Sequence, residues 1–230
     1  DWVYPNAAEA GYYRWSLPPE LNARLARQAA ALSPLERVGL LDKISALFSA
    51  GQMDGGDYLA YLTANARDED PDVTESVAGG IGGLRETFVS PAAEPAYDAY
   101  RQAILRPVLD RIGLQPAKDE PDYVNPLRAT LYGALGTEAA DPAVVAECRR
   151  LTALYLENPR SVDPSLASVS LSVAAYHGDA ALFESFKAAL EKARTPSGRS
   201  AYIRALNGFR DPALLQRALD YSLTPALNST

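Results

Sequence analysis

Residues 163–222 decide the fold, and they read DPSLASVSLSVAAYHGDAALFESFKAALEKARTPSGRSAYIRALNGFRDPALLQRALDYS. A helix start recurs in this stretch about every 16 residues, at Asp163-Pro164, Gly178-Asp179, Thr195-Pro196 and Asp211-Pro212. Asp and Thr side chains accept hydrogen bonds from the free amides of a first helical turn, and a proline at the next position loses no bond there. Each repeat therefore predicts one helix of about 11–13 residues and a tight turn.

Apolar residues between these starts fall at helical spacing. The stripes comprise Leu182, Phe183, Phe186, Ala189 and Leu190 in one expected helix, and Leu214, Leu215, Ala218 and Leu219 in the next. Two periods make a helical hairpin of about 32 residues, which cannot bury its apolar stripes alone and must stack on its neighbours. The sequence therefore predicts an all-α fold, an α–α superhelix of the HEAT/armadillo-like solenoid type.

The pattern upstream of this stretch is helical from residue 18 or 19 onward. Ser33 and Glu36 form a capping box, in which each side chain can bond the other residue's free amide. Pro107 should break or kink its helix, because it removes a bond and clashes with the preceding turn. Residues 114–126 hold three prolines and form the expected long loop. The other expected helices cover 19–31, 33–51, 54–66 and 126–135, and further ones begin near 70, 90 and 141.

Two aromatic runs precede the helices, at residues 2–4 (WVY) and 11–17 (GYYRWSL). Both are bounded by proline or glycine and are typical of short strands. Because two strands do not fold by themselves, they either pack on the helices or belong to a β domain outside this chain. The sequence thus predicts a short N-terminal β segment.

Composition excludes several classes of function. The 230 residues carry a net charge of -7, with 47% hydrophobic and 22% charged residues. An acidic chain does not neutralise nucleic-acid phosphates or bind an anionic membrane surface, so we expect neither partner. No apolar run approaches the length of a membrane span. We expect a soluble protein, with cytoplasm and periplasm both open as its compartment.

The chain contains no recognisable active-site motif. Zinc hydrolysis needs two or three well-placed His, Cys or carboxylate ligands, whereas this chain has one histidine and one cysteine. Cys148 lies on an apolar stripe and is expected to be buried. His177 ends a helix, where a cation suits the dipole. We expect no catalytic residue and no metal ligand here.

Asp68, Asp70 and Asp72 alternate as in a calcium-binding loop. Val73 stands where such a loop needs its turn-making glycine. We therefore interpret these residues as a solvated acidic helix start.

Five stretches carry a resemblance to a known family. They are NAAEAGYYRWSL at 6–17, SPLERVGLLDKISALFSAG at 33–51, NPLRATLYGALG at 125–136, AAYHGDAALFESF at 174–186 and RALNGFRDPALLQRALDYSL at 204–223. In this order they resemble the helical C-terminal domain of zinc metallo-aminopeptidases of the aminopeptidase N family, which are gluzincins. The resemblance covers nearly the whole chain. Residues 15–17 (WSL) depart from it, because the family usually has a valine, a polar residue and an aromatic there.

The resemblance implies that catalysis and the helical repeats belong to different domains. In that family a preceding domain carries H-E-x-x-H, a downstream glutamate and G-A-M-E-N, and neither motif occurs here. The resemblance assigns residues 1–17 to the terminal strand of a preceding β domain and residues 18–230 to a helical-repeat C-terminal domain that is truncated at its end. It implies that this fragment is catalytically inert and that zinc belongs to the absent catalytic domain.

In the family, the helical domain encloses the active-site cavity and helps admit and hold peptides. The implied partners are thus the catalytic domain of the same polypeptide and peptide substrates. Arg128 and Tyr132, four residues apart on one helix, and Tyr202 and Arg204 on another are the candidate substrate-binding residues, because guanidinium and phenol groups suit a peptide carboxylate. Alternatively, both arginines pair with carboxylates between repeats and the tyrosines belong to the core.

Two other functions stay open. The chain could be a free-standing α-solenoid that binds a protein or an extended peptide along its concave face. It could also be a structural domain that mediates dimerisation.

Overall fold

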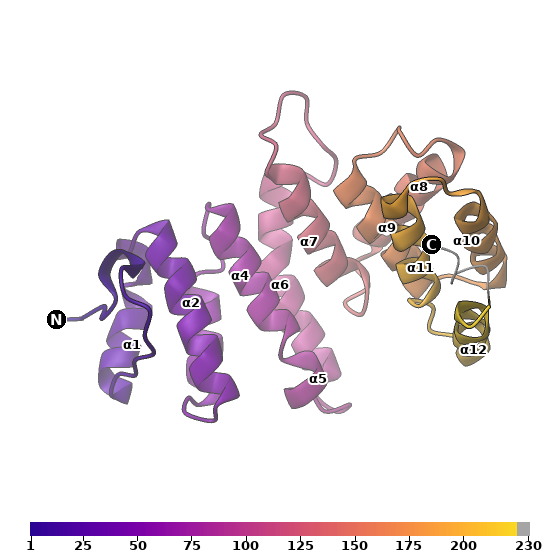
Figure 1. The fold of residues 1–230 in the computed structure, drawn as a ribbon. Helices are drawn as coiled ribbons and strands as arrows, with labels where there is room; N and C mark the ends of the chain where they lie inside the picture. The colour runs from indigo at the N-terminus through magenta and orange to yellow at the C-terminus, as the bar shows by residue number, and fades with distance from the viewer. Residues whose placement is uncertain (225–230) are drawn as a thin grey trace. The chain divides into compact units, whose positions relative to one another are not determined.

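The computed structural model describes residues 1–224, except the side chain of Glu86, and these residues form helices and connecting turns (Figure 1). The chain divides into two compact units, Asp1–Ile112 and Gly113–Thr230. No helix in the part that the structure describes is long and apolar enough to cross a membrane.

The first unit is built around helix α2. Its helices are α1 (Pro19–Arg27), α2 (Pro34–Ser49), α3 (Gly55–Ala64), α4 (Pro71–Gly82), α5 (Arg85–Phe88) and α6 (Glu94–Ile112), with 3-10 turns η1 (Ala7–Glu9) and η2 (Ala29–Ala31). Helix α2 packs on α3, α4 and η1, while α1 packs on α3. The capping box of Ser33 and Glu36 is confirmed at the start of α2. Residues buried on α2, including Leu40, Leu41 and Ile44, form its contribution to the core.

The second unit contains the repeated helices. They are α7 (Val124–Gly136), α8 (Pro142–Glu157), α9 (Pro164–Tyr176), α10 (Ala180–Lys192), α11 (Pro196–Leu206) and α12 (Pro212–Ser222). Asp163, Asp179, Thr195 and Asp211 each accept a hydrogen bond from an amide of the first turn, which confirms all four expected starts. Helix α9 packs on α7, α8 and α11, and α10 packs on α11.

The structure confirms the all-α class and changes two local expectations. Residues 1–224 contain no strand, so the expected N-terminal β segment is not confirmed. Residues 11–17 are irregular, because a strand needs a partner strand and no other segment of the described chain supplies one. Pro107 lies inside α6, which continues to Ile112, so the helix does not break there, and a kink at Pro107 stays a prediction. The superhelical arrangement and the domain division at residue 17 stay predictions.

Candidate functional site

Arg128 lies on α7 and is fully buried. Its two terminal nitrogens each donate to one carboxylate oxygen of Glu120 at 2.8 Å, which is a bidentate ion pair. One of them also donates to Asn125 Oδ1 at 2.5 Å, and Nε donates to the Gly113 carbonyl oxygen at 3.0 Å. The guanidinium group thus holds the loop before α7 to the helix, as bidentate carboxylate pairs do with high geometric specificity.

Tyr132 lies one turn further along α7 and is also fully buried. Its hydroxyl donates to the carbonyl oxygen of Leu114. Burial raises the pKa of this phenol well above its ordinary value, with a smaller contribution from Glu147. Arg128 and Tyr132 therefore both hold the loop before α7. Their side chains donate hydrogen bonds to other residues of the second unit. This geometry favours the structural alternative for these two residues.

The pairing of Glu120 with Arg128 predicts a dependence of stability on pH. The hydrogen bonds from Arg128 are the main cause that lowers the pKa of Glu120 below its ordinary value of 4.5. A carboxyl group whose pKa is lowered in the folded state stabilises the fold above pH 4.5, and this contribution is lost as the pH falls through the lowered pKa. We expect the difference in free energy of unfolding between wild type and Glu120→Gln to be largest near neutral pH and to shrink in acid. Urea titrations at several pH values measure it.

The Arg128→Ala background provides the control for this experiment. Without the guanidinium group, the main cause of the lowered pKa is gone. Glu120→Gln should then have an effect that varies little with pH. An unchanged pH dependence in that background would contradict the assignment to Arg128.

Tyr202 and Arg204 lie two positions apart on α11 and point to different surroundings. The Tyr202 ring is 4% exposed and its centroid lies 5.8 Å from that of Tyr155 and 6.1 Å from that of Phe186. Burial raises its pKa to about 12. Arg204 is exposed, and its Nη1 donates to Ser168 Oγ at 3.3 Å. Residues two positions apart in an α-helix point to nearly opposite sides of it, so Tyr202 and Arg204 do not form one site.

A hollow of about 500 Å³ lies where α8, α10 and α11 meet. Tyr155 and Tyr202 contribute to its lining, together with Lys192 and Arg194 at the end of α10. Lys192 and Arg194 are exposed. Sequence reasoning missed these two cations, because basic residues at the end of a helix are normally explained by the helix dipole. Only the packing of α11 on α10 brings them to the tyrosines.

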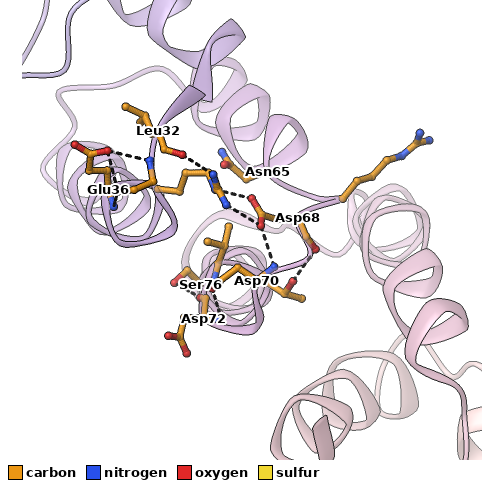
Figure 2. Close-up of polar contacts among 12 residues, drawn as sticks. Leu32, Glu36, Asn65, Asp68, Asp70, Asp72 and Ser76 are labelled. Carbon is orange, nitrogen blue, oxygen red and sulfur yellow. Dashed lines mark hydrogen bonds and ion pairs between the residues drawn. The ribbon is translucent and has the colours of Figure 1, made fainter. Parts of the chain in front are cut away.

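The acidic residues before α4 bind other groups of the same chain (Figure 2). Asp68 is 12% exposed and its carboxylate lies 2.6 Å from Arg37 Nε, while Arg37 Nη1 donates to the Leu32 carbonyl oxygen at 2.6 Å. Asp68 also accepts a hydrogen bond from the Asp70 amide, and Asp70 caps α4. The expectation of a solvated helix start is therefore wrong for Asp68, because an arginine distant in the sequence desolvates it. Asp70 caps the helix as expected.

No group of three or more His, Cys, Asp or Glu residues that could hold a metal ion occurs among the described residues. Cys148 is buried, as expected, and burial raises its pKa to about 12. His177 caps the end of α9, and its Nε2 lies 2.7 Å from the Gly136 carbonyl oxygen.

The sequence matches the family described as ERAP1-like C-terminal domain over residues 2–230. It is 23% identical to Aminopeptidase 2, mitochondrial, of Saccharomyces cerevisiae over 220 residues, which cover 94% of this chain and 23% of that protein. It is 26% identical to Aminopeptidase M1-A of Oryza sativa subsp. japonica, with 99% of this chain and 27% of that protein covered. For the Tricorn protease-interacting factor F2 of Thermoplasma volcanium the identity is 25%, over 93% of this chain and 24% of that protein. The chain thus spans about a quarter of the length of these curated relatives.

Proposed function

Because the chain belongs to the family of ERAP1-like C-terminal domains, we propose that it is the non-catalytic helical domain that walls off the active-site cavity of a zinc aminopeptidase. In this role it helps admit and hold peptide substrates while the parent enzyme removes their N-terminal residues. The match over residues 2–230 is the observation that carries the proposal. A wall of this kind excludes folded proteins and shields the chemistry from water.

The side-chain contacts of Asp68 and Cys148 support this proposed role. Asp68 and Cys148 are of residue types that often serve in catalytic or metal sites. Here Asp68 forms an ion pair with Arg37, and Cys148 is buried in the apolar core. Zinc and the groups that activate water would lie in a catalytic domain of the same polypeptide. The 230-residue fragment is then inert by itself.

The hollow beside Tyr202 is the surface that we assign to peptide contact. Lys192 and Arg194 place two cations next to two phenol rings there, and Arg204 lies exposed on the same helix as Tyr202. Cations and phenol hydroxyls suit the carboxylate of a peptide tail.

The test compares short and long substrates in the full-length enzyme that carries this domain. We expect the double substitution Lys192→Ala/Arg194→Ala to raise the Michaelis constant for peptides of about ten residues at least about fivefold, since charge-assisted hydrogen bonds are lost at a partly screened surface. The constant for an aminoacyl fluorogenic substrate, which has no tail, should stay unchanged.

The double substitution Arg24→Ala/Arg27→Ala is the matched control, because it removes the same charge from exposed positions on α1. It should leave both Michaelis constants unchanged. Equal effects of the two double substitutions on the Michaelis constant would indicate that it responds to the net charge of the domain and not to contacts in the hollow. An unchanged constant for long peptides would remove the hollow from the substrate path.

A further inference from the structure

Gly39 lies inside α2, where a glycine destabilises a helix relative to an alanine. It does not have the positive φ for which glycine is usually needed. A β-carbon at this position would instead lie 2.2 Å from the carboxyl carbon of Glu9. Glycine is therefore explained here by the Glu9 carboxylate, which lies directly against the helix backbone.

Two donors of the N-terminal segment hold the Glu9 carboxylate in this place. The Tyr4 hydroxyl donates to one carboxylate oxygen, and Asn6 Nδ2 donates to the other at 2.8 Å. Asn6 is 6% exposed and also binds the backbone of Gly11, whose amide donates to Oδ1 at 2.8 Å and whose carbonyl oxygen accepts from Nδ2 at 3.0 Å. Residues 4–11 thus form a closed turn around the Asn6 side chain.

Glu36, in the first turn of α2, binds the same turn at a second point. Its carboxylate accepts a hydrogen bond from the Ala8 amide at 2.9 Å, and its carbonyl oxygen accepts one from the Tyr4 hydroxyl at 3.1 Å. Ala8 and Glu9 have φ angles of 55° and 52°, which residues other than glycine keep only where the surrounding contacts impose them. The turn is therefore fixed on α2 at two points, Glu36 and Gly39.

A segment whose backbone is fixed in this way is not a flexible linker. We propose that Glu9 and Gly39 form a clasp, which holds the N-terminal segment on α2 and so sets the orientation of the first unit relative to the domain that precedes it. This inference rests on the proposed function, in which the catalytic domain precedes the helical domain in one polypeptide. Glu9 and Gly39 are then positioning residues, which touch no substrate and act through the orientation of the first unit.

The substitution Gly39→Ala separates the clasp from the stability of α2. Alanine favours the helix, but its β-carbon displaces the Glu9 carboxylate and so removes the acceptor that Tyr4 and Asn6 share. In the 230-residue chain, we expect hydrogen exchange of the backbone amides of residues 7–11 to become at least about tenfold faster, as measured by mass spectrometry. Exchange of the amides in α2 should stay the same or become slower.

Gly79→Ala is the matched control, because Gly79 also lies inside a helix of the first unit but a β-carbon there meets no atom within 4 Å. It should leave the exchange of residues 7–11 unchanged. Glu9→Ala is the second variant and should accelerate this exchange as Gly39→Ala does. The double variant should exchange no faster than either single variant, because both substitutions remove the same contact. The clasp is overturned if Gly39→Ala leaves residues 7–11 as protected as in the wild type, or if it accelerates exchange in α2 equally.

The orientation is measured in the full-length enzyme that carries this domain. One spin label is attached at the exposed position 49 of α2, through Ser49→Cys, and a second one on the catalytic domain. We expect Gly39→Ala to widen the distribution of distances between the two labels at least about twofold, and Gly79→Ala to leave it unchanged. An unchanged distribution for Gly39→Ala would overturn the positioning role. Neither measurement uses turnover, so a failure of the proposed function would be seen separately, as the absence of aminopeptidase activity in the wild-type enzyme.

Discussion

Arg128→Ala is expected to lower the free energy of unfolding by about 3–5 kcal/mol, because it removes one partner of a buried ion pair. The substitution leaves the Glu120 carboxylate, the Asn125 side-chain oxygen and the Gly113 carbonyl oxygen without the guanidinium donor that they share. Water reaches this site poorly, since Arg128 is fully buried and Glu120 is 13% exposed. Urea denaturation followed by far-UV circular dichroism measures the loss.

Arg14→Ala is the control for this prediction. It also breaks an arginine–carboxylate pair, but the Arg14 and Asp42 side chains are 67% and 76% exposed. Exposed pairs contribute about 0–1 kcal/mol, so the control should stay within that range. The double variant Arg128→Met/Glu120→Gln removes both charges and should cost less than the sum of its single substitutions, because no unpaired charge is left buried. Equal losses for Arg128→Ala and Arg14→Ala would contradict the buried network.

Phe186→Ala is expected to cost about 3–5 kcal/mol, since it empties a large volume in a packed interior. Phe186 is fully buried on α10, and its ring lies 6.0 Å from that of Phe209 and 6.1 Å from that of Tyr202. These rings belong to one apolar cluster that joins α9, α10, α11 and α12. Because the three aromatic residues pack on one another, the surrounding side chains are not expected to fill the cavity. Denaturant titration measures the loss in free energy of unfolding, in the transition that includes the second unit.

Leu219→Ala provides the comparison within the repeated helices. Leu219 belongs to the same predicted apolar stripe as Leu214 and Ala218 but is 58% exposed on α12. Its replacement should change the free energy of unfolding by no more than about 0.5 kcal/mol. A loss at Leu219 similar to that at Phe186 would indicate that the sequence stripe, and not the observed burial, sets the energetics.

These two comparisons illustrate where sequence reasoning about the site succeeds and fails. The pairing of Arg128 with a carboxylate was open in the sequence as one of two alternatives, but its partner Glu120 lies in a proline-rich loop with no periodic pattern. Lys192 and Arg194 were not predicted as site residues, because only the packing of α11 on α10 brings them to the hollow that Tyr202 lines. The burial of Lys43 on α2 was not predicted, and its Nζ lies 5.7 Å from the ring of Trp15, in a segment that the sequence predicted to be a strand.

The sequence by itself determined the helices and their starts in the second unit, because capping and helical periodicity act between residues three or four positions apart. Asp163, Asp179, Thr195 and Asp211 needed no distant partner to be recognised. The tertiary structure alone decided which charges are buried, as for Arg128, Asp68 and Lys43. Burial depends on segments far apart in the chain, and the free energy of a charge changes far more with its exposure to water than with its neighbours in sequence.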